Sequence, residues 1–233
     1  MQSVMLYGAP VWYKVMEIKK YGEMLRKDQR QMLLRVISAY RTVSQSAVNV
    51  ISAVAPIDLM VTERTRTYDR REDRNRNKTR IRERSITIAT WQRRWLNNQK
   101  DAQWTKRLIP DIATWVNCSF RRTDYFLTQF LSGHGCFRAY VFRIGKAENA
   151  RCTYCEEVDT AEHTVLACAR WNDARRGAAL QVGEVLTVES IVGLMIASAR
   201  NWKTISEMIG TILSRKEAEI REQQREAMVE TVK

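Results

Sequence analysis

Residues 152–168, CTYCEEVDTAEHTVLAC, hold three of the five cysteines of the chain and one of its two histidines. The Cys-x2-Cys pair, Cys152 and Cys155, predicts a tight turn that directs two thiolates to one point. Seven residues separate Cys155 from His163, and four separate His163 from Cys168. Because Zn²⁺ takes four such ligands in a tetrahedron, the sequence predicts a CCHC zinc knuckle with Thr160 capping a short helix that carries His163.

This predicted zinc site is structural rather than catalytic. Four protein ligands fill the coordination shell, so no position remains for an activated water. The alternative is a coincidence of buried cysteines with a surface histidine. Cys118 and Cys136 are left over, each alone in an apolar or aromatic stretch. The odd cysteine count argues against a secreted disulfide framework, so we expect a reducing compartment and no secretion.

Basic residues flank the knuckle, whereas its turn is acidic. The turn carries four carboxylates, Glu156, Glu157, Asp159 and Glu162, which repel phosphate. We therefore expect any nucleic-acid contact at the flanks, at Arg143, Lys146 and Arg151.

Outside the knuckle the sequence predicts a mainly α-helical fold. The 233 residues are 45% hydrophobic but include only 9 Gly and 3 Pro, too few turn residues for an architecture of many strands. Apolar residues recur at helical spacing from Leu25 to Tyr40. A second helix follows over residues 47–54, with Ser44 or Ser46 as its N-cap and Pro56 as its end, and a third begins at Ile57. These helices predict a small bundle.

Charge is the second guide to function. The chain has 39 basic and 26 acidic residues, a formal net charge of +13, which favours a polyanionic partner over a merely soluble arginine-rich surface. Residues 64–84 contain ten basic and four acidic residues, a pattern of one long solvated helix that is also compatible with a nucleic-acid-facing helix. The predicted nucleic-acid contacts in this part of the chain are Arg64, Arg66, Arg70, Arg71, Arg74, Arg76, Lys78, Arg80, Arg93 and Arg94.

Tryptophans follow this basic stretch. Trp91 and Trp95 are four residues apart and share one helix face. Stacking on bases is one interpretation, and core packing is the favoured one. His134 lies between two glycines, as a turn residue or a phosphate contact.

The C-terminal part predicts further helices. One begins after Thr187 and runs to about residue 200, and an amphipathic helix follows over residues 202–213. Residues 216–222 are charged all round, so we expect this tail to project or fray.

No secretory signal opens the chain and no apolar run approaches the roughly 20 residues of a membrane span, so no membrane partner is expected. The apolar run at residues 6–12 is unusual for a free terminus and suggests that an upstream neighbour is missing.

Several motifs together resemble one protein family. They are LYGAPVW at residues 6–12, AYRTVS at 39–44, APIDL at 55–59, LTQFLSGHG at 127–135 and the knuckle. In order and spacing they resemble the C-terminal region of non-LTR retrotransposon reverse transcriptase polyproteins, in particular type-1 arthropod elements that insert into ribosomal DNA. The resemblance covers nearly the whole chain.

The resemblance implies a division into four segments and a function. The segments are a thumb-like helical bundle (1–62), a basic Trp-rich helical linker (63–149), the CCHC knuckle (150–172) and C-terminal helices (173–233). Such a region grips the element's template RNA and the target DNA during target-primed reverse transcription. Its partners are RNA, DNA and the upstream polymerase domain, and its expected location is nuclear, otherwise cytoplasmic.

The sequence departs from the full family pattern at the catalytic residues. An RNA-directed DNA polymerase holds two Mg²⁺ ions with an Asp-Asp motif, and this chain has no Asp-Asp pair and no acidic endonuclease constellation. We therefore expect no catalytic residue here, Mg²⁺ only in the missing polymerase domain, and no nucleotidyltransferase or endonuclease activity from this chain alone. The alternatives are a domesticated stand-alone zinc-dependent nucleic-acid-binding protein and a helical protein-interaction module.

Overall fold

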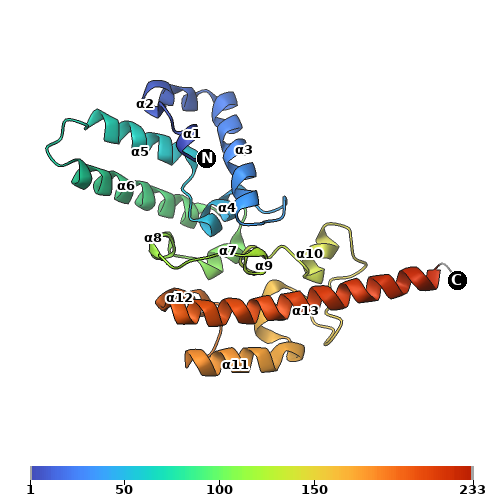
Figure 1. Cartoon of the computed structure of the whole chain (residues 1–233). Helices are drawn as coiled ribbons and strands as arrows, with labels where there is room; N and C mark the ends of the chain where they lie inside the picture. The colour runs from blue at the N-terminus through green and yellow to red at the C-terminus, as the bar shows by residue number, and fades with distance from the viewer. Residues whose placement is uncertain (1, 232–233) are drawn as a thin grey trace. The chain divides into compact units, whose positions relative to one another are not determined.

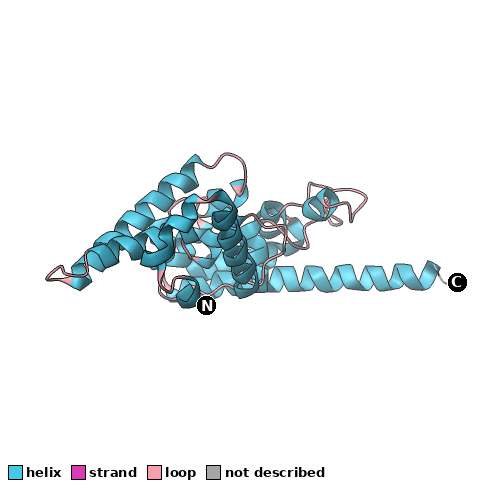
Figure 2. Cartoon of the chain, turned by 90° about the horizontal axis from the view of Figure 1, so that it is seen from above, coloured by secondary structure: helices cyan, strands magenta, loops and turns pink. Residues whose placement is uncertain are grey.

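The computed structural model describes residues 2–231, which form helices, turns and loops without a strand (Figures 1 and 2). This confirms the expected mainly α-helical fold. Contacts divide the chain into two compact units. Unit 1 comprises the residues up to 37 together with 44–117, and unit 2 comprises 38–43 together with the residues from 118 onward.

The structured segments of unit 1, in chain order, are α1 (Gln2–Met5), α2 (Ala9–Trp12), a 3-10 turn (Tyr13–Glu17), α3 (Lys19–Val36), α4 (Gln45–Ser52), α5 (Ile57–Asp69), α6 (Arg76–Asn97), α7 (Gln103–Leu108) and α8 (Ile112–Asn117). The apolar run at the start packs into this unit, because Leu6 and Ala9 form a buried cluster with Ile57 and Val61 of α5.

Polar side chains fix how α3, α4 and α5 join. The Ser44 hydroxyl accepts the N–H of Ala47 at 3.3 Å, which makes Ser44 rather than Ser46 the N-cap of α4. Gln29 of α3 is buried, and its side chain donates to the carbonyl of Ala55 at 2.9 Å and accepts the N–H of Ile57 at 3.0 Å. One amide thus satisfies both sides of the α4–α5 turn around Pro56.

Three tryptophans of unit 1 are core residues, as favoured from the sequence for Trp91 and Trp95. Trp91, Trp95 and Trp115 are each at most 3% exposed. The indole N–H of Trp95 donates to the carbonyl of Ile109 at 2.8 Å, and that of Trp115 to the carbonyl of Val50 at 2.7 Å. These side chains therefore hold the helices together and are not available to stack on bases.

The basic stretch 64–84 is not one long helix, which corrects the sequence prediction. A turn at residues 70–75 separates α5 from α6, the two helices contact each other, and Asn75 caps α6 by accepting the N–H of Lys78 at 3.0 Å. Glu83 explains the hairpin, because its side chain is fully buried and pairs with Arg66 at 2.7 Å and with Arg70. A buried carboxylate needs such partners, so these two arginines serve the fold.

The main helices of unit 2 are α9 (Tyr125–Ser132), α10 (Arg138–Arg143), α11 (Asn172–Val182), α12 (Ile191–Ala197) and α13 (Ala199–Thr231). The LTQFLSGHG motif forms α9 and its end, where Gly133 adopts a left-handed conformation. Gly135 is required for lack of space, because a Cβ at this position would lie 1.9 Å from Oε1 of the buried Gln129 side chain. Nothing larger than hydrogen fits at that position without a shift.

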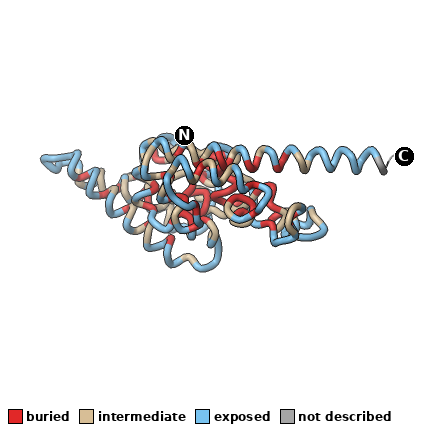
Figure 3. The backbone as a smooth tube through the Cα atoms, turned by 90° about the horizontal axis from the view of Figure 1, so that it is seen from below, coloured by how far each residue is buried: buried red, intermediate tan, exposed pale blue. Residues whose placement is uncertain are grey.

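Helix α13 differs from the charged tail expected for residues 216–222. The helix is continuous, and Lys216 and Glu217 are buried at 3% and 9% exposure. Only from residue 221 onward are its described side chains all exposed (Figure 3). The buried face that the apolar residues of 202–213 form therefore continues through Lys216 and Glu217, whose side chains are buried in unit 2.

The four segments expected along the chain stay a prediction, and residues 63–149 contribute to both units. Within residues 2–231 no single helix is long and apolar enough to cross a membrane, although α4 and α5, a pair bent by 56°, meet those criteria of length and composition jointly.

Candidate metal centre

The predicted knuckle forms a closed loop whose backbone bonds aim its side chains inward. The N–H of Cys152 donates to the carbonyl of Glu157 at 2.7 Å, and Glu156 takes a left-handed conformation with φ of 62°. Thr160 caps the following turn by accepting the N–H of His163 at 3.0 Å, as expected. Residues His163–Ala167 form one π-helical turn, after which Cys168 closes the loop.

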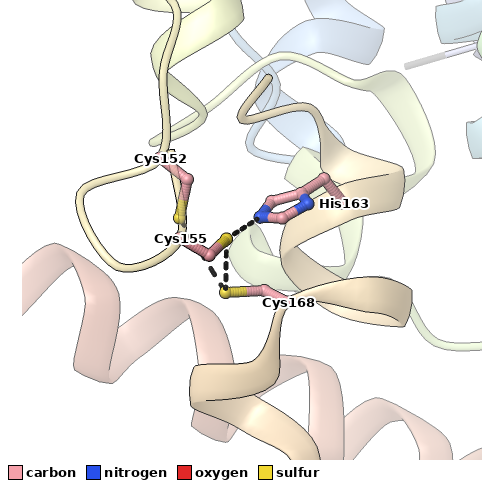
Figure 4. A group of neighbouring side chains, drawn as sticks. All are labelled: Cys152, Cys155, His163 and Cys168. Carbon is pink, nitrogen blue, oxygen red and sulfur yellow. Dashed lines mark hydrogen bonds between the residues drawn. The ribbon is translucent and has the colours of Figure 1, made fainter. Parts of the chain in front are cut away.

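The four predicted ligands meet at one point (Figure 4). Their ligand atoms all lie within 4.8 Å of one another. The Sγ atom of Cys168 is 3.8 Å from that of Cys152 and 3.9 Å from that of Cys155, and the Sγ of Cys155 is 3.2 Å from Nε2 of His163. A tetrahedral zinc site with Zn–S bonds of about 2.3 Å separates its sulfurs by about 3.8 Å. The cluster therefore fits Zn²⁺ with small shifts of its side chains.

The protonation of these groups makes metal binding depend on pH. Burial raises the pKa of the Cys168 thiol to about 12 when no ion is bound, with the neighbouring thiols adding to the shift. Burial lowers the pKa of His163, which keeps the ring neutral and able to ligate. Since the ligands bind as thiolates, metal uptake releases protons and the affinity falls as the pH is lowered.

Arg175 of α11 lies next to the four predicted metal ligands. Arg175 donates from Nη2 to the carbonyl of Cys168 at 2.7 Å and to that of Ala167 at 3.4 Å. Its Nη1 atom is buried and finds no hydrogen-bond partner among the described residues. Three thiolates, a neutral imidazole and Zn²⁺ carry a net charge of −1, so a fixed guanidinium here balances charge and holds the backbone of the last ligand.

We expect Arg175→Met to lower the zinc affinity by about 10- to 100-fold, the range found when outer hydrogen-bond partners of metal ligands are removed. Competition with a chromophoric chelator measures the effect. Arg176→Met is the matched control, because Arg176 is the exposed neighbour on the same helix and its loss should leave the affinity unchanged. Equal affinities of the two variants would show that Arg175 does not support the site.

Two groups of contacts attach the knuckle to α13. The first is buried: Nζ of Lys216 lies 2.6 Å from both carboxylate oxygens of Asp159 and 2.7 Å from the hydroxyl of Thr164. The second is more exposed, where Glu219 accepts from the Tyr154 hydroxyl and from Arg170 at 2.8 Å. Asp159 lies between Cys155 and His163 in the chain, and Thr164 follows His163. Because Lys216 of α13 contacts both residues, α13 helps to set the shape of the knuckle.

The aromatic side chains of the knuckle are used in this docking. Tyr154 packs edge-on against Trp171, which is 4% exposed, and Arg170 lies over both rings. Burial, together with the bond to Glu219, raises the pKa of Tyr154 above its ordinary value. These rings are therefore committed to packing rather than offered to a ligand.

The predicted nucleic-acid contacts fall into two classes. Arg66 and Arg70 pair with the buried Glu83. The others are exposed, although Arg94 pairs with Asp58 at 2.5 Å and Arg71 with Glu72 at 3.9 Å. The exposed contacts are Arg64, Arg71, Arg74, Arg76, Lys78, Arg80, Arg93 and Arg94 in unit 1 and Arg143, Lys146 and Arg151 in unit 2. The structure also shows a groove of about 690 Å³ on unit 1, whose lining includes Arg64, Arg80 and Arg84.

His134 is engaged within unit 2. Its Nε2 accepts from Arg143 at 3.0 Å, so the neutral ring carries its proton on Nδ1 and donates to the Thr42 hydroxyl at 3.0 Å. The ring stacks on Tyr140 at 4.8 Å. Burial and the charge of Arg143 lower the pKa of His134 to about 4. Both nitrogens are therefore occupied, which favours the turn interpretation over a phosphate contact.

Some residues of the site were missed from the sequence. Lys216 was expected in a projecting charged tail and Asp159 in an acidic turn, and Arg175 had no predicted role. A weak signal existed for Lys216, which continues the helical spacing of Ile209, Ile212 and Leu213, the buried face of α13. None exists for Arg175, whose contact depends on how α11 leaves the knuckle.

Comparisons with known proteins give one consistent group of relatives. The sequence is similar to the Retrovirus-related Pol polyprotein from type-1 retrotransposable element R1 4 of Nasonia vitripennis, 24% identical over 215 residues, which cover 86% of this chain and 54% of that protein. It is also similar to the Putative 115 kDa protein in type-1 retrotransposable element R1DM of Drosophila melanogaster, 28% identical over 201 residues, covering 75% of this chain and 19% of that protein. No family model and no solved structure matches.

A third relative is the Pol polyprotein from element R1 2 of Nasonia vitripennis, 25% identical over 185 residues, covering 72% of this chain and 45% of that protein. The chain thus spans between about a fifth and about a half of the length of these curated relatives. The resemblance expected from the motifs is confirmed: the curated homologues of this chain are Pol polyproteins of R1 type-1 retrotransposable elements in arthropods.

Proposed function

We propose that this chain is the nucleic-acid-binding part of a retrotransposon Pol polyprotein and that it grips template RNA and target DNA during target-primed reverse transcription. The observation that carries this proposal is the surface of the α5–α6 hairpin. Eight of the predicted contacts are exposed in unit 1, and five of them, Arg71, Arg74, Arg76, Lys78 and Arg80, lie within ten consecutive positions. Cations spaced this closely suit a polymer with regularly repeated phosphates.

The groove on unit 1 supports the same proposal. Its lining combines the cations Arg64, Arg80 and Arg84 with the polar side chains of Thr67 and Asn77, and its one carboxylate, Glu63, pairs with Arg84 at 3.4 Å. Phosphate and sugar oxygens are bound by this mixture of charged and neutral donors, which fixes the position of a strand without reading its sequence.

The metal centre has a structural role in this proposal. Cys152, Cys155, His163 and Cys168 would hold Zn²⁺, which closes the loop and so fixes α11 and α13 around it. The chain contributes no catalytic residue, and the nucleotidyltransferase chemistry with its Mg²⁺, like any endonuclease step, belongs to other parts of the polyprotein. The partner of this chain within the polyprotein is then the polymerase domain, and its place of action is the nucleus.

We expect binding of RNA and DNA to weaken steeply with salt. If about six phosphates are neutralised, the logarithm of the affinity falls with a slope of about −5 against the logarithm of salt concentration, or about 10³-fold between 50 and 200 mM. Fluorescence anisotropy over a salt series measures the slope. Replacing Arg64, Arg74, Lys78 and Arg80 together by Gln should make the slope shallower by about 3 to 4, since each lost contact removes about 0.9.

A charge-matched variant distinguishes a binding surface from bulk charge. Lys14, Lys19, Lys20 and Lys27 are exposed on the 3-10 turn and α3 of the same unit. Their replacement by Gln removes the same four charges and should change the slope little. A flat salt profile of the unmodified chain, or no binding of either nucleic acid, would contradict the proposed function and would favour a protein-interaction module.

A further inference from the structure

Exposed apolar side chains alternate with cations at the end of α10, in unit 2. Phe142 is 49% exposed and Ile144 is 38% exposed, and the exposed Arg143 and Lys146 lie between and beside them. We call residues 142–146 the α10 tip; it includes the end of α10 in Figure 1. A single exposed hydrophobic residue is ordinary on a protein surface, but a half-exposed aromatic ring followed in the chain by exposed cations is an arrangement that can bind a base and its phosphate.

The α10 tip has a defined backbone shape. The N–H of Gly145 donates to the carbonyl of Phe142 at 2.9 Å, and the N–H of Lys146 donates to that of Val141 at 2.9 Å. Gly145 has a φ of 71°, the left-handed conformation that such a helix ending needs. The chain turns sharply here because of this ending, which keeps Phe142 and Ile144 at the surface and lowers the entropy lost when a ligand binds.

Arg143, which follows Phe142 in the chain, is also held in place. The guanidinium of Arg143 donates to Nε2 of His134 and lies 5.5 Å from the centre of the Tyr140 ring. One hydrogen bond leaves most of the five donors of a guanidinium available to a phosphate. The neighbourhood is basic as well, since residues 138–151 include four cations and a single carboxylate, Glu148.

We infer that the α10 tip is a stacking subsite for an unpaired base of single-stranded RNA or DNA, with Phe142 against the base and Arg143 and Lys146 beside the phosphates. The inference rests on the proposed function and adds a preference for single strands. A base inside a duplex is already stacked on its neighbours, whereas an unpaired base gains from an aromatic ring. Arg143 and Lys146, which follow Phe142 in the chain, complement the phosphates of the same strand.

The test compares Phe142→Ala with the unmodified full chain, using anisotropy of a labelled single-stranded oligodeoxythymidylate of about 15 nucleotides and of a duplex of equal length. Loss of one stacking ring should weaken single-strand binding by about tenfold. The salt slope should not change, because no charge is lost. Duplex binding should also stay the same, and Phe142→Trp should retain the single-strand affinity.

Leu180→Ala is the matched control, because Leu180 is an exposed apolar residue of α11, 80% exposed, in the same unit. If Phe142→Ala binds single strands as Leu180→Ala does, while the unmodified chain binds with a steep salt slope, the stacking subsite is wrong and the proposed function stands. If the unmodified chain binds neither probe, both are wrong. Phe142-dependent binding to phosphatidylserine vesicles without an effect on single strands would assign the α10 tip to a membrane surface and overturn the inference.

Discussion

Removing the metal ion is expected to unfold residues 150–172 selectively. Apparent binding energies of structural zinc in small metallo-domains are about 10–16 kcal/mol, which is as large as the whole stability of a typical domain. The regular structure of this segment is small: one π-helical turn, a 3-10 turn at Ala169–Trp171 and an isolated bridge between Arg151 and Val158. Three of its four predicted ligands are cysteines whose thiols contribute little packing once the ion is gone. A chelator, or Cys155→Ser, should therefore convert the segment into a loose loop.

Hydrogen exchange and limited proteolysis locate the effect. After chelation, amides in residues 150–172 should lose protection and the loop should become sensitive to protease, while α3–α6 of unit 1 keep their protection. Cys118→Ser is the control, because Cys118 is a free cysteine outside the cluster and its replacement should leave the chelator response unchanged. Unaltered protection of residues 150–172 after the chelator would mean that the loop does not depend on a metal.

Breaking the buried ion pair of α13 is expected to have the second-largest effect. Lys216 is 4% exposed at its side chain and Asp159 is 1% exposed. Lys216→Met leaves the Asp159 carboxylate buried with only neutral donors, the Thr164 hydroxyl at 2.5 Å and the N–H of Arg138 at 2.8 Å. An uncompensated buried charge costs about 3–5 kcal/mol, so the free energy of unfolding of unit 2 should fall by about that amount.

Denaturant titration of the variants measures this loss. The double variant Lys216→Met with Asp159→Asn should recover part of the stability, because it buries no charge and the amide can keep hydrogen bonds to its neighbours. Lys203→Met is the control on the same helix, since Lys203 forms an exposed pair with Glu207 at 3.9 Å and such pairs contribute little. A loss for Lys216→Met no larger than that for Lys203→Met would show that the pair does not anchor the knuckle.

The metal ligands were predictable because they are local in sequence. All four lie within residues 152–168, and a tetrahedral site restricts both the residue types and their spacing. The caps at Ser44 and Thr160 and the helix end at Gly133 were also readable, because each depends on a side chain within three residues of its target or on a single backbone conformation.

The charged residues were misjudged because their partners are distant. Lys216 and Asp159 are 57 positions apart, so nothing nearby in the sequence marks either as buried. Glu83 looked like one of many solvated charges, although it lies in the core of the α5–α6 hairpin and takes two of the predicted nucleic-acid contacts, Arg66 and Arg70, as its partners. The turn at residues 70–75 contains neither Gly nor Pro, which explains why one long helix was expected there.

The most direct measurement is the metal content of the purified full chain, with X-ray absorption at the zinc edge. The four clustered side chains predict one zinc per chain, bound by three sulfurs at about 2.3 Å and one nitrogen at about 2.0 Å. A chain that is natively ordered over residues 150–172 yet contains no zinc, or a zinc bound mainly by oxygen, would contradict a metal-centred knuckle and the nucleic-acid-binding frame built on it.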